Sequence, residues 1–112
     1  MESLRSEVDD IRGELARRNL VSLALRCRRS LRETRTLLES NINVLFPEQT
    51  AEARSDLANW LDYAAEHITA ALSKEHDFEI IMQRLYISVL LINHVLDTMW
   101  QATEDLKRRH LL

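Results

Sequence analysis

Hydrophobic residues repeat along much of this chain at alternating steps of three and four, which is the period of one face of an α-helix. The longest such series runs unbroken through Phe78, Met82, Leu85, Val89, Ile92, Leu96, Met99, Thr103 and Leu106. β-branched residues in this segment also suit a strand, but a period that persists beyond ten residues favours a helix. We therefore expect one long helix from Asp77 to Arg109, roughly 50 Å in length at about 1.5 Å per residue.

A second apolar set, Ile80, Ile87 and Leu91, falls on the other side of the same segment. A helix that is apolar around most of its circumference is normally enclosed by neighbours. A chain of 112 residues offers few elements to enclose it. The sequence therefore predicts a homodimer with these three residues in the interface.

The first segment carries two apolar series that are out of phase. The earlier consists of Leu4, Val8, Ile11 and Leu15, and the later of Leu20, Ala24, Cys27, Leu31, Thr34 and Leu38. The step of five residues between Leu15 and Leu20 indicates either a stutter in a continuous helix or a bend near residues 17–19. We expect this helix to end near Ser40 and Asn41, before a connection that includes Pro47.

The middle segment predicts a second helix, whose inward series is Leu57, Leu61, Ala64, Ile68 and Ala71. Pro47 suits its first turn, and Thr50 is the competing N-cap. Residues 73–77 are the expected turn before the third helix, with Asp77 as that helix's N-cap. No glycine ends the second helix there, so a continuous or kinked helix through the turn is the alternative.

One glycine and one proline leave almost no turn chemistry for connecting strands. The prediction is an all-α fold of one domain, residues 1–112: an elongated, antiparallel and dimeric bundle of about three long helices, with the third helix central. A single cysteine, Cys27, fits a reducing compartment. The acidic, periodic N-terminus predicts neither a secretory signal nor a transit peptide. The apolar run of residues 86–92 is too short for a bilayer, so we expect a cytoplasmic protein with no membrane contact.

Charge is unevenly distributed, although the net charge is only −3. Residues 15–36 hold seven arginines and one acidic residue, whereas residues 39–112 hold six basic and twelve acidic residues. Projected at about 100° per residue, the arginines fall on the half of the first helix opposite its Leu20–Leu38 series. Such a face is often simply solvated, or paired with acidic residues such as Asp62, Glu66 and Glu79.

Val21 and Leu25 project from the middle of this basic half, where a surface that only follows phosphates has no use for them. We therefore predict a non-enzymatic protein that binds another protein, as adaptors, inhibitors, immunity-type proteins and secretion chaperones do. The predicted partner-binding residues are Val21, Leu25, Arg28, Arg29, Arg32, Arg35 and Tyr63. The alternative is a nucleic-acid-binding regulator that uses the arginines, which here lack the aromatic platform that stacks bases.

Catalytic and metal-binding patterns are weak. Four histidines are present, but no Glu-x-x-His motif of a helical di-metal site occurs. His67 is the candidate for phosphotransfer, but packing beside Trp60 and Tyr63 explains it much better. No glycines support a nucleophile elbow. We expect no catalytic residues, metal site or cofactor.

Overall fold

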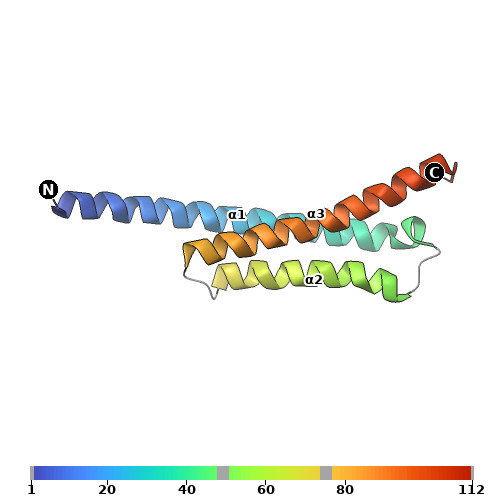
Figure 1. Ribbon diagram of the computed structural model, residues 1–112, viewed down its shortest axis with the longest axis horizontal. Coiled ribbons are helices and arrows are strands. Elements are labelled where there is room, and N and C mark those ends of the chain that lie inside the picture. The colour runs from blue at the N-terminus through green and yellow to red at the C-terminus, as the bar shows by residue number, and fades with distance from the viewer. Residues whose placement is uncertain (1, 48–50, 74–76, 112) are drawn as a thin grey trace.

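The computed structural model describes residues 2–47, 51–73 and 77–111, and these ranges form three helices packed against one another (Figure 1). They are α1 (Glu2–Leu45), α2 (Ala51–Ser73) and α3 (Phe78–Arg108). No strand occurs in the described ranges. The predicted all-α bundle of three long helices is confirmed, and α3 lies within one residue of its predicted ends.

α1 is one continuous helix, so the five-residue step between its two apolar series is a stutter and not a bend. The expected end near Ser40 and Asn41 is wrong, because the helix continues to Leu45. Ile42 and Leu45 pack against the core, and the backbone amide of the buried Phe46 donates to the carbonyl of Ile42 at 3.0 Å. This apolar packing at the C-terminal end outweighs the low helix propensity of the serine and asparagines.

The connection between α1 and α2 is held by Arg54. Its Nη2 and Nε donate to the backbone carbonyl of Phe46 at 2.6 and 3.1 Å, and its Nη1 donates to Oδ1 of Asn43 at 2.8 Å. We expected Pro47 in the first turn of α2. That prediction is wrong, because the helix begins at Ala51. The alternative N-cap, Thr50, lies outside the described residues.

Asp77 caps α3 as predicted. Its backbone is extended, at φ −83° and ψ 121°, and its Oδ1 accepts from the amides of Glu79 at 2.9 Å and Ile80 at 3.4 Å. An extended residue here excludes a continuous helix from α2 into α3. Residues 74–76 of the expected turn lie outside the described part of the chain.

The core of α1 and α2 follows the predicted series closely. All six members of the later α1 series are buried, and so are Leu57, Leu61, Ala64, Ile68 and Ala71 on α2. The hydroxyl of the buried Thr34 donates to the carbonyl of Ser30 at 2.7 Å, so burying this polar group costs little free energy. Cys27 is a buried free cysteine in this core.

α3 is turned in the core relative to our expectation. Leu85, Ile92, Met99 and Leu106 are buried as predicted, but the other buried members of the face are Ser88 and Val95, both 0% exposed. Phe78, Met82 and Val89 are exposed instead. The series 85, 88, 92, 95, 99 also alternates three and four, and the small Ser88 allows a neighbouring helix to approach closely. Its hydroxyl donates to the carbonyl of Leu85 at 2.7 Å.

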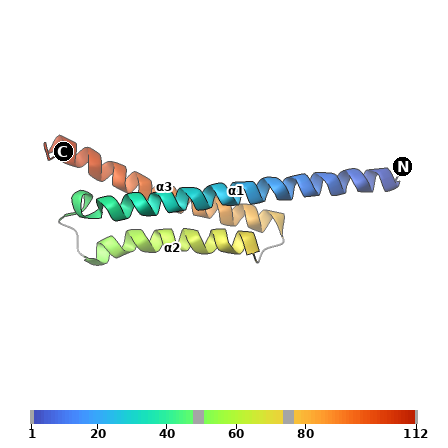
Figure 2. The same ribbon diagram turned by 180° about the vertical axis from the view of Figure 1, so that it is seen from behind.

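The molecule is elongated, with principal extents of 70 × 24 × 17 Å. Each helix contacts the other two. The N-terminal turns of α1, blue in Figures 1 and 2, extend beyond the ends of both other helices. The first buried residue of α1 is Leu20, among those whose burial is described.

Candidate partner-binding surface

One face of α1 combines apolar and basic side chains. Val21, Leu25, Arg28, Arg32 and Arg35 follow one another at steps of four and three, so they share a side of the helix. Val21 and Leu25 are 50% and 49% exposed. We call this set, together with the adjacent Arg29, the basic face of α1.

The C-terminal end of the basic face forms an ion pair with α2. Nη2 of Arg35 lies 2.8 Å from Oδ1 of Asp62, and their side chains are 35% and 61% exposed. An ion pair this exposed contributes about 0–1 kcal/mol, so it orients Arg35 more than it stabilises the bundle. Asp62 is one of the three acidic partners considered for the arginines from the sequence.

The other arginines of this half of α1 remain available. Arg17, Arg18, Arg26, Arg28, Arg29 and Arg32 are exposed. In the part of the chain that the structure describes, none of these six guanidinium groups is in an ion pair. The surface thus presents several solvated positive charges around two half-exposed aliphatic side chains.

Tyr63 is 57% exposed on α2 but is not beside the apolar end of the basic face. Val21 lines a cavity of 290 Å³ together with Ala71 and Leu72 of α2. Tyr63 precedes Ala71 by eight residues, about 12 Å along the helix axis. It is instead the chain neighbour of Asp62, at the Arg35 end. The predicted site is therefore divided between an apolar end on α1 and an aromatic residue on α2.

The predicted self-association residues lie on α3 with different degrees of burial. Ile80 and Ile87 are 39% and 38% exposed, whereas Leu91 packs partly against the core of its own chain. Further apolar side chains are exposed along the N-terminal half of α3, on other sides of the helix as well, namely Phe78, Met82, Tyr86, Val89 and Leu90. The rotation of α3 explains this, because burying Ser88 and Val95 turns Met82 and Val89 toward solvent. The alternative series 85, 88, 92, 95, 99, which also repeats at steps of three and four, was the sequence signal that Met82 and Val89 are exposed.

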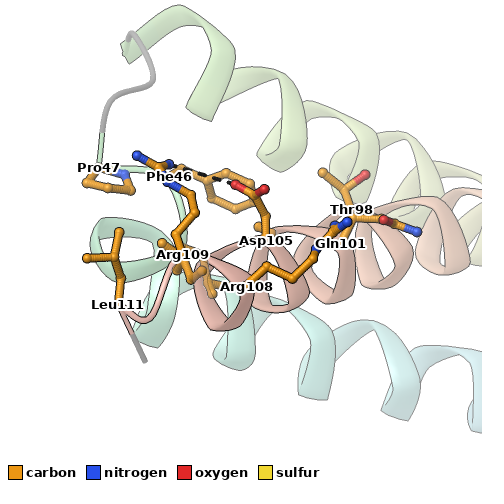
Figure 3. Close-up of a pocket in the computed structure, with 11 residues that line it drawn as sticks. Phe46, Pro47, Thr98, Gln101, Asp105, Arg108, Arg109 and Leu111 are labelled. Atoms are coloured by element: carbon orange, nitrogen blue, oxygen red, sulfur yellow. Dashed lines mark ion pairs between the residues drawn. The ribbon is translucent and has the colours of Figure 1, made fainter.

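A surface cavity of 470 Å³ lies where the C-terminal ends of α1 and α3 meet (Figure 3). Phe46 and Pro47 line one side, and Thr98, Gln101 and Arg108 extend along α3. Arg109 points back toward Asp105, with Nη1 3.8 Å from Oδ2. The cavity is lined by residues 45–47 and by residues from Thr98 onward, which are more than 50 positions apart, so no sequence motif connected them.

The histidines with described contacts take part in packing between α2 and α3. The ring of Trp60 meets that of His94 edge-on, with centroids 5.2 Å apart and planes at 64°. Nη1 of Arg84 lies 3.4 Å from Nδ1 of His67. Among the described residues no three His, Cys, Asp or Glu side chains are grouped so as to hold a metal ion.

α3 is also long and apolar enough, by length and composition, to cross a membrane. This is weak ground for a membrane span, because the core helix of a bundle passes the same test. The expectation of a chain without membrane contact stays a prediction.

Comparison with known proteins finds no family model that matches the chain, and no curated protein or solved structure that matches it.

Proposed function

We propose that this chain is a non-enzymatic, antiparallel helical module of the cytoplasm that acts by binding another protein through the basic face of α1. The observation that carries this proposal is the position of Val21 and Leu25, half exposed among solvated arginines. Aliphatic side chains in such a position favour a partner that buries them, with an acidic rim opposite the arginines. Adaptors, inhibitors, immunity-type proteins and secretion chaperones act through surfaces of this kind.

Self-association is part of the same proposal. Ile80, Ile87 and the partly buried Leu91 are the residues that we propose for a homodimer interface on α3. Leu90, which is also exposed and follows Ile87 by three positions, extends this apolar surface, and large apolar patches on a small protein usually mark interaction sites. Ile87→Glu should weaken the dimer through this face.

Capture of partners by the tagged full-length chain tests the protein-binding function. Leu25→Glu should abolish the complex and leave the fold intact, since Leu25 is 49% exposed and outside the core. Leu37→Glu is the matched control, because Leu37 is 50% exposed on the same helix but lies off the face through Leu25 and Arg28. Equal capture by both variants and the wild type would contradict the assignment of the basic face.

Nucleic-acid binding is the second candidate, and the six solvated arginines favour it. In that case Leu25→Glu should matter less than the double change Arg28→Glu with Arg32→Glu, which reverses two charges one turn apart. Gel-shift titrations with random duplex and single-stranded oligonucleotides at about 50 mM salt distinguish the candidates, because phosphate contacts weaken steeply as salt rises. Tight, salt-sensitive shifts that the double variant loses would replace protein binding as the conclusion.

A further inference from the structure

The N-terminal part of α1 projects from the other helices of the described chain. It extends beyond α2 and α3 in both views (Figures 1 and 2). Ile11 and Leu15 are 58% and 53% exposed, and burial within α1 is first described at Leu20. The projecting segment nevertheless has the apolar period of a helix that packs against something: Leu4, Val8, Ile11 and Leu15 recur at steps of four, three and four.

Ile11 and Leu15 lie on the side of α1 opposite its core series. Because α1 is continuous, the step of five residues from Leu15 to Leu20 turns the apolar face by about 140°. The side that packs on α2 and α3 begins at Leu20. The side of α1 that carries Ile11 and Leu15 is therefore not the side on which α2 and α3 pack, and another molecule can cover it.

The charged residues beside the apolar stripe of residues 4–15 favour a second copy of this chain as the partner. In heptad notation Leu4 and Ile11 are d positions, and Val8 and Leu15 are a positions. The flanking e positions are then Arg5 and Arg12, and the flanking g positions are Glu7 and Glu14. In a parallel pair of helices a g residue meets the e residue five positions later on the other helix. Glu7 of each copy is thus opposite Arg12 of the other.

An antiparallel pair of the same segments would place g opposite g and e opposite e, so that glutamate meets glutamate and arginine meets arginine. The segment is self-complementary in the parallel arrangement alone, in charge as well as in its apolar stripe. Gly13, which would weaken packing in the seam, occupies the outward f position, and nothing lies within 4 Å of a Cβ at that site.

We propose that residues 4–15 form a short parallel coiled coil with the same segment of a second copy of this chain. The interface uses neither the basic face of α1 nor the apolar residues of α3, so the proposal is independent of the proposed function. The parallel pairing places both bundles at the C-terminal end of the coiled coil. Two copies of the candidate partner-binding surface can then meet one target. The segment has four a and d positions and is shorter than two heptads, so the association is weak and depends on concentration.

Light scattering of the full-length chain between about 5 and 200 µM tests the interface. The test uses the Ile87→Glu variant, in which the proposed α3 dimer is weakened. Its mass should rise with concentration toward twice the chain mass of 13.1 kDa. Adding Ile11→Glu should hold this chain at the monomer mass without lowering its melting temperature, because Ile11 is outside the core. Adding Leu37→Glu instead, which changes an exposed apolar residue elsewhere on α1, should leave the association in place. An Ile87→Glu chain that stays monomeric throughout overturns the proposal, and so does equal association with and without Ile11→Glu.

Charge exchange tests the pairing of Glu7 with Arg12. Glu7→Arg alone and Arg12→Glu alone should each weaken association, since like charges then face each other in both copies. Mixing these two variants, or combining both changes in one chain, should restore it. Failure of either combination to restore association overturns the charge pairing on which the choice of partner rests.

Orientation is tested with Leu4→Cys in a Cys27→Ala background. In the parallel arrangement equivalent residues face each other, so mild oxidation should link two chains through position 4. An antiparallel pair would place position 4 opposite position 15 and leave the two introduced thiols far apart. A chain that associates but yields no such disulfide overturns the parallel arrangement.

Discussion

Ser88 and Val89 are adjacent on α3, yet the serine is 0% exposed and the valine 38% exposed. From the sequence Val89 belongs to the apolar face and Ser88 does not. The structure reverses them because the neighbouring helices pack closely over a small residue whose hydroxyl is satisfied by the carbonyl of Leu85. Hydrophobic periodicity located four core positions of α3 correctly but could not choose between two series that share them.

Two valines on α3 provide a matched test of this rotation. Val95→Ala should lower the free energy of unfolding by about 1–3 kcal/mol, because Val95 is 0% exposed and its methyl groups leave a cavity. Val89→Ala should change it by less than about 0.5 kcal/mol, since Val89 remains in contact with water and alanine is the better helix former. Urea denaturation followed by circular dichroism measures both. A larger loss for Val89→Ala than for Val95→Ala would mean that α3 buries the face predicted from the sequence.

The same residue-scale reasoning succeeded on α1, where all six members of the Leu20–Leu38 series are buried. That helix has one continuous apolar series in this region, with arginines on the other side, so only one face is available to the core. The same period of α1 places Val21 and Leu25 outside the core series, and both are half exposed in the structure. The separation of Tyr63 from them depends on how α2 lies against α1, and the period of one helix carries no information on that.

At the scale of the element, helix ends depend on contacts as well as on local chemistry. Asp77 carries its capping signal in its own side chain, and its role could be read from the sequence. The end of α1 could not, because Leu45 and Phe46 are held by the core and by Arg54, a residue eight positions beyond Phe46. Local composition near Ser40 and Asn41 indicated an end that this packing overrides.

Asp77 offers a test at this scale. Asp77→Ala should lower the free energy of unfolding by about 0.5–2 kcal/mol, because the amides of Glu79 and Ile80 lose their acceptor. Asp77→Asn keeps an acceptor oxygen and should cost less. Thermal melts compare the two, and hydrogen exchange should show faster exchange in the first turn of α3 for the alanine variant. Identical melting temperatures for Asp77→Ala, Asp77→Asn and the wild type would mean that the side chain of Asp77 does not stabilise α3.

At the scale of the whole molecule, the lengths of the helices determine its shape. α1 has 44 residues, α2 has 23 and α3 has 31. At about 1.5 Å per residue α1 alone spans roughly 66 Å, close to the longest extent of 70 Å. The other helices cannot cover all of it. The apolar period of residues 4–15 was visible in the sequence, but its isolation became apparent only when the three helices were placed together.

This division of α1 predicts that its two parts contribute to different properties. A chain without residues 1–16 should melt within about 2–3 °C of the full chain when both are dilute enough to be monomeric, because the described core begins at Leu20. Leu31→Ala in the full chain is the control: Leu31 is 6% exposed on the same helix, and its loss should cost about 2–5 kcal/mol. Calorimetry at low concentration compares the three proteins. A shortened chain that melts as early as Leu31→Ala would mean that the projecting turns stabilise the bundle itself, whereas an unchanged melt leaves their apolar stripe available for contact between molecules.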